Sequence, residues 1–171
     1  MNRTGHFPVS ILMCACVLII TPSPARSQVS ATVGYQALHL PDNWVTKGVN
    51  FDAARDVSGA WSVVGEFGLV NDGGGGADEV GFNIFNIGGG VRWSLRRDGP
   101  APFAQLVAGV QLSRSETDED TAFMLQPGGG VHVPINDRWG VSAQFDYRPV
   151  FYQEETVNEV RFVIGARWTR P

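Results

Sequence analysis

Histidine, serine and acidic side chains are the residues of this sequence that could carry out hydrolysis. A Ser–His–acid hydrolase needs an imidazole within hydrogen-bonding reach of a hydroxyl nucleophile. His39 borders a predicted loop beside Leu38 and Leu40, and His132 has no serine two residues away on the same face of its predicted strand. Neither histidine forms a His-x-Ser pattern, so we predict no catalytic residues.

An acidic cluster could instead bind a divalent cation. Glu116, Asp118, Glu119 and Asp120 offer the hard carboxylate oxygens that calcium prefers. They lack the spaced D-x-D-x-D-G pattern of a calcium loop, and two histidines on distant strands make a weak metal site. We therefore predict no metal and no cofactor, and interpret the cluster as a solvated, repulsive rim.

Composition and charge exclude several classes of protein. The 171 residues have a formal net charge of −4 with only 18% charged side chains, and the mean hydropathy is −0.05. A disordered chain would need low hydrophobicity, and a helical multi-span membrane protein would need runs of about 20 apolar residues. Lys47 is the single lysine and no basic run exists, so we predict no nucleic-acid partner.

The first 27 residues have the layout of a secretory signal peptide. Arg3 supplies a positive start, residues 9–20 form an apolar run, and Ala25-Arg26-Ser27 places small residues before a cleavage point. The apolar run is shorter than the roughly 20 residues of a transmembrane helix. We predict that 1–27 is a cleaved signal peptide and that 28–171 is the folded domain.

Cleavage after residue 27 would change the chemistry of the chain. Cys14 and Cys16 would leave with the signal, so the mature protein would have no disulfide and no cysteine ligand. Its 144 residues would have a formal charge of −6.

Polar and apolar residues alternate with period two along the mature chain, which predicts β-strands. In the clearest segment, Trp139, Val141 and Phe145 share one face, and Gln144 and Asp146 share the other. Many segments are longer than the roughly 5–6 residues of a soluble strand and match the 9–11 of a tilted membrane strand. The predicted strands are 29–38, 48–55, 60–70, 80–96, 102–114, 121–133, 139–151 and 158–169.

The predicted connections alternate between long and short. The long ones are 39–47, 71–79, 115–120 and 152–157, and the last three contain nine of the 17 acidic residues. An up-and-down chain places these acids at one end. The tryptophans predicted to form an aromatic girdle near the short-turn rim are Trp61, Trp93, Trp139 and Trp168. The phenylalanines predicted toward the other rim are Phe67, Phe85, Phe123 and Phe151.

Glycine-rich strands and an Asp-containing turn carry a resemblance to a known family. The segments are 87–93 (IGGGVRW), 127–140 (PGGGVHVPINDRWG) and 143–148 (AQFDYR). With them, the chain over about 29–169 resembles the OmpA/OmpX-like eight-stranded outer membrane β-barrels. The resemblance implies an all-β, eight-stranded antiparallel up-and-down transmembrane β-barrel over 28–171.

The same resemblance implies a location and partners. The chain would lie in the bacterial outer membrane, with loops 71–79, 115–120 and 152–157 extracellular and both termini periplasmic. Its partners would be outer membrane lipid and lipopolysaccharide, the barrel-assembly machinery and an unknown surface ligand.

Charged residues on the polar faces would then lie inside a narrow barrel. A barrel of eight strands has an interior that is just wide enough for side chains to fill. Buried charges must be paired, so we predict an ion-pair network with Glu66 and Asp146 against Arg92, Arg148 and Arg161. The lumenal candidates are Asp52, Glu66, Arg92, Asp146, Arg148 and Arg161, with Arg96 and Arg167 on the same register. Pro127 and Pro149 lack the N–H that a closed sheet needs, and we expect them above the bilayer or at β-bulges.

The sequence favours a non-enzymatic outer membrane barrel with a structural or surface-interaction role. Three alternatives stay open: a narrow ion-conducting pore, a lipid A-modifying enzyme and a soluble lipocalin-like ligand carrier.

Overall fold

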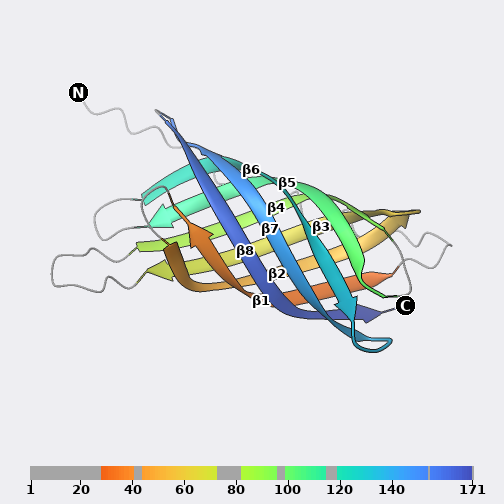
Figure 1. Ribbon diagram of the computed structural model, residues 1–171. Coiled ribbons are helices and arrows are strands. Elements are labelled where there is room, and N and C mark those ends of the chain that lie inside the picture. The colour runs from red at the N-terminus through yellow and green to blue at the C-terminus, as the bar shows by residue number, and fades with distance from the viewer. Residues whose placement is uncertain are drawn as a thin grey trace, which may run out of the picture.

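The computed structural model describes residues 28–40, 44–72, 82–95, 99–114, 119–153 and 155–170, which form a closed β-barrel (Figure 1). The predicted signal peptide (1–27), Arg96 and most of the long loop 71–79 lie outside these residues. No helix in the described part of the chain could span a bilayer. The strands are β1 (Val29–His39), β2 (Trp44–Ser58), β3 (Trp61–Asp72), β4 (Phe82–Ser94), β5 (Ala101–Arg114), β6 (Glu119–Pro134), β7 (Trp139–Phe151) and β8 (Thr156–Arg170).

Each strand pairs antiparallel with its neighbours in the chain, and β8 returns to pair with β1 from Val29–Arg170 to His39–Val160. The predicted eight-stranded, up-and-down barrel is thereby confirmed. Closure leaves no strand edge with unpaired backbone groups, as a sheet surrounded by hydrocarbon requires. We call the two ends of the barrel the short-turn end and the long-loop end. The short-turn end carries the described termini and the described connecting residues 59–60, 95, 99–100 and 135–138.

The barrel is polar inside and apolar outside. Among the described residues, 19 buried side chains are polar or charged and 12 are apolar. Large apolar side chains instead cover the outer surface, where Val33 is 60% exposed, Phe145 54% and Ile164 49%. A soluble carrier with an apolar cavity would have the opposite distribution of polar and apolar side chains. The outer surface of this barrel is therefore suited to contact with lipid.

Several strand limits differ from the sequence-based prediction. β2 begins at Trp44, so the predicted loop 39–47 is wrong over 44–47. Trp44 pairs with His39 across the ladder and their rings meet edge to face at 4.7 Å, while a β-bulge between Gln36 and Leu38 adjusts the register. Residues 119–120 and 156–157, predicted as loop, likewise belong to strands. Side-chain pairs across the ladder extend these strands beyond the segments of clear alternation.

Pro127 and Pro149 lie inside strands, and neither lies at the β-bulge that the sequence analysis expected as one possibility. Pro127 on β6 and Pro149 on β7 both fall where the paired residues of these two strands stop at Met124–Val150 and resume, in the same register, at Gly128–Asp146. On their other sides Pro127 pairs with Leu106 and Pro149 with Asn158. Both prolines therefore interrupt one stretch of the β6–β7 ladder, and this ladder is paired on either side of that stretch.

Aromatic residues form cross-strand pairs at both ends of the barrel. Trp61 pairs with Trp93, and Trp139 with Trp168, all four near the short-turn end. The four phenylalanines predicted toward the other rim make ring contacts closer to the long-loop end, with centroids 4.8 Å apart for Phe67–Phe85 and 6.1 Å for Phe123–Phe151. Aromatic side chains at both interfaces suit the two boundaries of a bilayer.

Gly128 gives a test of how tightly the wall packs against the lumen. A Cβ atom added there would meet the Asp146 carboxylate and lie 2.7 Å from the Phe145 carbonyl, whereas at Gly89 the nearest atom would be 3.7 Å away. We predict that Gly128→Ala lowers the free energy of unfolding by about 1–3 kcal/mol through overpacking. Gly89→Ala is the matched control and should change it by much less, as measured by guanidinium unfolding in lipid vesicles. Equal effects of the two substitutions would contradict this account of Gly128.

Candidate functional site in the barrel lumen

All six predicted lumenal charges point into the barrel. Each is at most 3% exposed, although they come from five different strands. Alternation explains this arrangement, because every second residue of a barrel strand faces the interior. The residues are Asp52 on β2, Glu66 on β3, Arg92 on β4, Asp146 and Arg148 on β7, and Arg161 on β8.

Arg161 is the centre of the ion-pair network. Its Nη1 and Nη2 donate to the two oxygens of Glu66 at 2.6 and 2.8 Å. Its Nε and Nη2 donate to Asp146 Oδ2 at 3.0 and 2.7 Å. One planar guanidinium thus holds two carboxylates from strands on different sides of the lumen, which is the paired geometry that makes buried charge tolerable.

Arg148 forms a second ion pair, with a partner that the sequence-based prediction missed. Its Nη2 lies 3.6 Å from Glu159 Oε2, and it also donates to the Gln111 side-chain oxygen. Gln111 in turn donates to Glu159 Oε1 at 2.9 Å. The expected pairing of Arg148 with Glu66 or Asp146 is therefore corrected to Glu159, which the same alternation places on the inner face of β8.

Arg92 also has a different partner from the one expected. Its Nη1 donates to Asp52 Oδ1 at 3.1 Å, and its Nε donates to Gln105 Oε1 at 2.9 Å. Gln105 Nε2 donates onward to Asp146 Oδ1 at 3.3 Å. Arg92 thus belongs to a separate pair, which one glutamine joins to the central network.

Buried glutamines complete the network, and the sequence analysis did not single them out. Gln126 donates to both Glu66 oxygens at 3.1 and 3.2 Å, and Gln144 donates to Asp146 Oδ2 at 2.8 Å. Their inward positions were readable from the alternation, but their partners depend on how strands meet across the barrel. Together with the ion pairs they give a hydrogen-bonded side-chain layer to which β2 through β8 all contribute.

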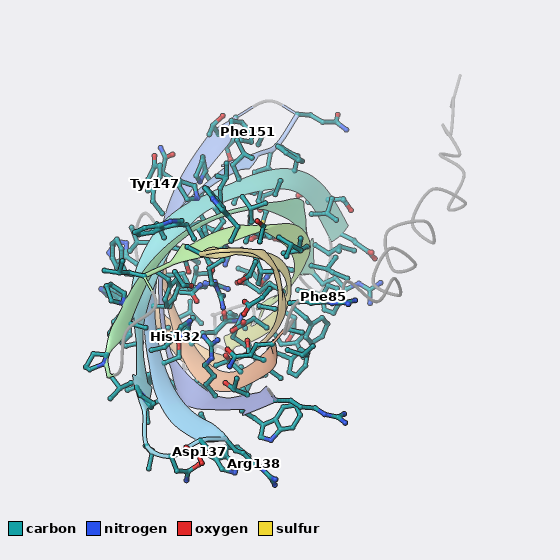
Figure 2. The ribbon with its side chains drawn as sticks, turned by 90° about the vertical axis from the view of Figure 1, so that its right-hand side faces the viewer. Phe85, His132, Asp137, Arg138, Tyr147 and Phe151 are labelled. Atoms are coloured by element: carbon teal, nitrogen blue, oxygen red, sulfur yellow. The ribbon has the colours of Figure 1, made fainter. Side chains whose placement is uncertain are left out.

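His132 meets a serine that a search along one strand could not find. Ser142, opposite it on β7, lies with its Oγ 3.0 Å from His132 Nδ1. Phe103 stacks on the imidazole with ring centroids 4.2 Å apart, and Figure 2 shows His132 inside the ring of strands. Among the described side chains no carboxylate hydrogen-bonds the imidazole, so the pair lacks the orienting third group of a hydrolase triad.

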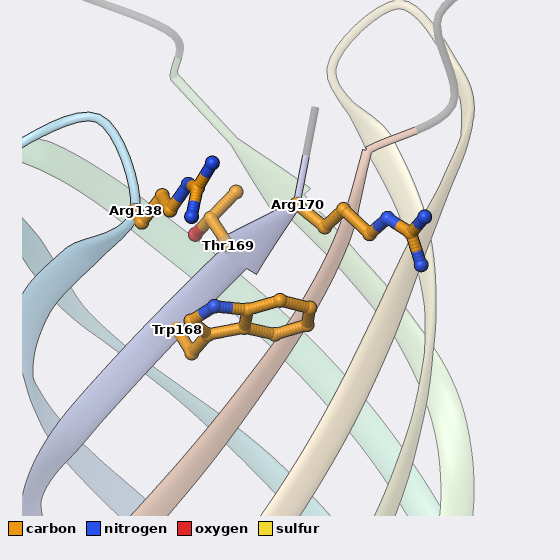
Figure 3. Close-up of a pocket in the computed structure, with 4 residues that line it drawn as sticks. All are labelled: Arg138, Trp168, Thr169 and Arg170. Atoms are coloured by element: carbon orange, nitrogen blue, oxygen red, sulfur yellow. The ribbon is translucent and has the colours of Figure 1, made fainter.

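In the described part of the chain, no group of three or more His, Cys, Asp or Glu side chains could hold a metal ion. A separate hollow lies on the short-turn rim, lined by Arg138, Trp168, Thr169 and Arg170 (Figure 3).

A closed eight-stranded barrel with an apolar outer face and a charged, side-chain-filled interior is the architecture of a bacterial outer membrane β-barrel. Solved structures of that class are similar to this chain. Neisserial surface protein A has a TM-score of 0.66 at 11% identity, covering 83% of this chain and 96% of that one. The Yersinia pestis attachment invasion locus protein Ail, in complex with the heparin analogue sucrose octasulfate, has a TM-score of 0.60 at 16% identity, covering 84% and 99%.

The N-terminal β-barrel domain of Pseudomonas aeruginosa OprF has a TM-score of 0.54 at 12% identity, covering 85% of this chain and 100% of that one. No protein-family model matches the chain, and no curated protein matches it in sequence. These similarities establish the fold. The chain has the eight-stranded antiparallel barrel fold of those outer membrane proteins, as the sequence predicted.

Arg161 should be the most costly lumenal side chain to remove. Arg161→Met leaves Glu66 and Asp146 buried without their cation, and we predict a loss of about 3–5 kcal/mol in the free energy of unfolding. Guanidinium titrations in lipid vesicles, followed by tryptophan fluorescence, would measure it.

The exposed pair Arg114–Glu119 provides the control, with side chains 67% and 52% exposed and 3.0 Å between Nη2 and Oε2. Arg114→Met should cost less than about 1 kcal/mol. Adding Glu66→Gln and Asp146→Asn to Arg161→Met should recover part of the stability, because the stranded charges are then gone. A wild-type stability in Arg161→Met would refute the central role of this residue.

Proposed function

We propose that this chain is a non-enzymatic outer membrane barrel with a structural or surface-interaction role. The supporting observation is the side-chain layer across the lumen, in which Arg161 joins Glu66 on β3 to Asp146 on β7. A lumen closed in this way would let few ions or solutes through, so a function would lie at the ends of the barrel. On this proposal, the lumen is the rigid core of a barrel that anchors the protein in the membrane.

The three alternatives fit the described residues less well. A lipocalin-like carrier needs an apolar cavity, whereas 19 polar or charged side chains are buried here. A hydrolase that modifies lipid A needs a base held by a third group, and the His132–Ser142 pair lies inside the lumen rather than on the lipid-facing surface. A narrow ion path is the strongest alternative, because the lumen is charged along its length.

The surface role is proposed for the long-loop end. We place loops 71–79, 115–120 and 152–157 outside the cell and the termini in the periplasm, with lipid and lipopolysaccharide around the barrel. The acidic residues of these loops make this end unlike a heparin-binding surface, because acidic side chains repel sulfated polyanions. The surface therefore suits a cationic or neutral ligand. The barrel-assembly machinery is the proposed partner during insertion.

Conductance in planar bilayers tests the closed lumen. We predict no steady channels for the wild-type protein, because hydrogen-bonded side chains fill its cross-section. Replacing Glu66, Asp146 and Arg161 together by alanine removes the central layer and should produce discrete openings. Alanine at Arg114 and Glu119, the exposed pair, is the matched control and should stay silent. Stable single-channel currents from the wild-type barrel would favour the pore instead.

Cysteine labelling tests the orientation. Glu155 is exposed at the long-loop end and Ile135, 69% exposed, lies in the 135–138 turn at the other end. With a membrane-impermeant maleimide on intact cells, we predict that Glu155→Cys is labelled and that Ile135→Cys is labelled only after the outer membrane is permeabilised. The reverse pattern would invert the proposed topology.

The unsubstituted chain is the control for that experiment. It should give no label once 1–27 has been cleaved, since Cys14 and Cys16 both lie in that segment. Labelling of this control protein would show that the segment is retained.

A further inference from the structure

Four polar atoms near the short-turn end of the lumen have no hydrogen-bond partner. They are Thr32 Oγ1, Arg92 Nη2, His132 Nε2 and Arg167 Nη1. Arg92, Thr32 and His132 are 1%, 2% and 7% exposed, and Arg167 is half-buried. We call these four residues the donor cluster. Buried polar groups are nearly always satisfied in native proteins, so four such atoms together call for a missing partner.

The donor cluster lies in one layer of the barrel. Thr32 on β1 is directly opposite Arg167 on β8. The charges of Arg92 and Arg167 act on each other, and His132 lies within the field of both. The Arg92 guanidinium also sits 4.7 Å from the centroid of Phe103, the ring on which His132 stacks. Side chains from four strands thus lie near one another in this layer.

These atoms are donors. A guanidinium has no acceptor, and a threonine hydroxyl can donate. For His132 we assign the tautomer in which Ser142 donates to Nδ1, so that Nε2 carries the proton and donates as well. The other unpartnered lumenal atoms are a mixture of donors and acceptors. The donors are Arg148 Nε, Arg148 Nη1 and Asn86 Nδ2, and the acceptors are Asn86 Oδ1, Gln36 Oε1, Gln126 Oε1 and Glu159 Oε2.

The nearby carboxylates are already engaged. Asp52 accepts from Arg92 Nη1, and Gln105 accepts from Arg92 Nε, which leaves Nη2 free. Asp56 accepts from Ser62 Oγ at 2.7 Å. Asp52 and Asp56 balance much of the positive charge of the layer, so a bound group is held by directed N–H and O–H bonds more than by net charge.

We propose that the donor cluster binds a small oxyanion, such as phosphate. An oxyanion offers several acceptor oxygens at once, and arginine binds phosphate through two parallel N–H groups. Arg167 is the half-buried member and lies three residues before the end of β8. A ligand would therefore enter from the mouth at the short-turn end, the end that faces the viewer in Figure 2 with Asp137 and Arg138 at its rim.

The test uses the mature barrel, refolded in neutral detergent free of phosphate and sulfate. Calorimetry and 31P NMR with inorganic phosphate should show one saturable site per barrel. Arg167→Gln should weaken binding by about tenfold or more, the effect of losing one charge-assisted contact. Thr32→Val removes only a hydroxyl and should weaken binding severalfold.

Arg170→Gln is the matched control. Arg170 is exposed on the same strand and carries the same charge, so its loss should change the affinity by less than about twofold. No saturable phosphate binding by the wild-type barrel would overturn the proposal, and so would equal weakening by Arg167→Gln and Arg170→Gln. Gel mobility before and after heating checks that each variant is folded. If Arg167→Gln does not fold, Thr32→Val decides, because an unchanged affinity in that variant overturns the site.

Discussion

The constraint on which this structure depends is that a backbone in hydrocarbon must satisfy all of its own hydrogen bonds. The sheet therefore closes between β1 and β8, and closure with eight strands fixes a narrow interior. Alternation then sends every second side chain into that interior and the rest into lipid. Closure and alternation thus separate two faces, and in this molecule the outer face is apolar and the inner face is polar and charged.

Closure also explains why the charged groups of the lumen are paired. A charge in a space this narrow loses most of its hydration and must find partners on other strands. Arg161 does this by sharing one guanidinium between Glu66 and Asp146, and glutamines donate further hydrogen bonds to the same two carboxylates. The two prolines fall on the same stretch of the β6–β7 ladder, so the two absent N–H donors interrupt the pairing of that ladder alone.

Much of the fold could be predicted from the sequence because strand parity is a local property. Alternation alone assigned Glu66, Arg92 and Arg161 to the inner face, and the structure buries all three. Partners across the lumen were harder, because they depend on the stagger between strands. That stagger is set by features such as the bulge between Gln36 and Leu38, which alternation does not reveal. Hence Arg148 was assigned the wrong carboxylate. His132–Ser142 was missed for a related reason, since the serine lies across a hairpin rather than along the strand.

The network divides the lumen, and this division gives the two ends different possibilities. On the proposed function, the layer around Arg161 blocks the lumen, so a ligand of the donor cluster would enter and leave through the mouth at the short-turn end. The donor cluster is nevertheless connected to that layer, because Arg92 donates to Gln105 and Gln105 donates to Asp146. A ligand that repositions Arg92 would therefore alter the hydrogen bonds of the carboxylate that Arg161 holds, which links occupancy at the short-turn end to the tightness of the central layer.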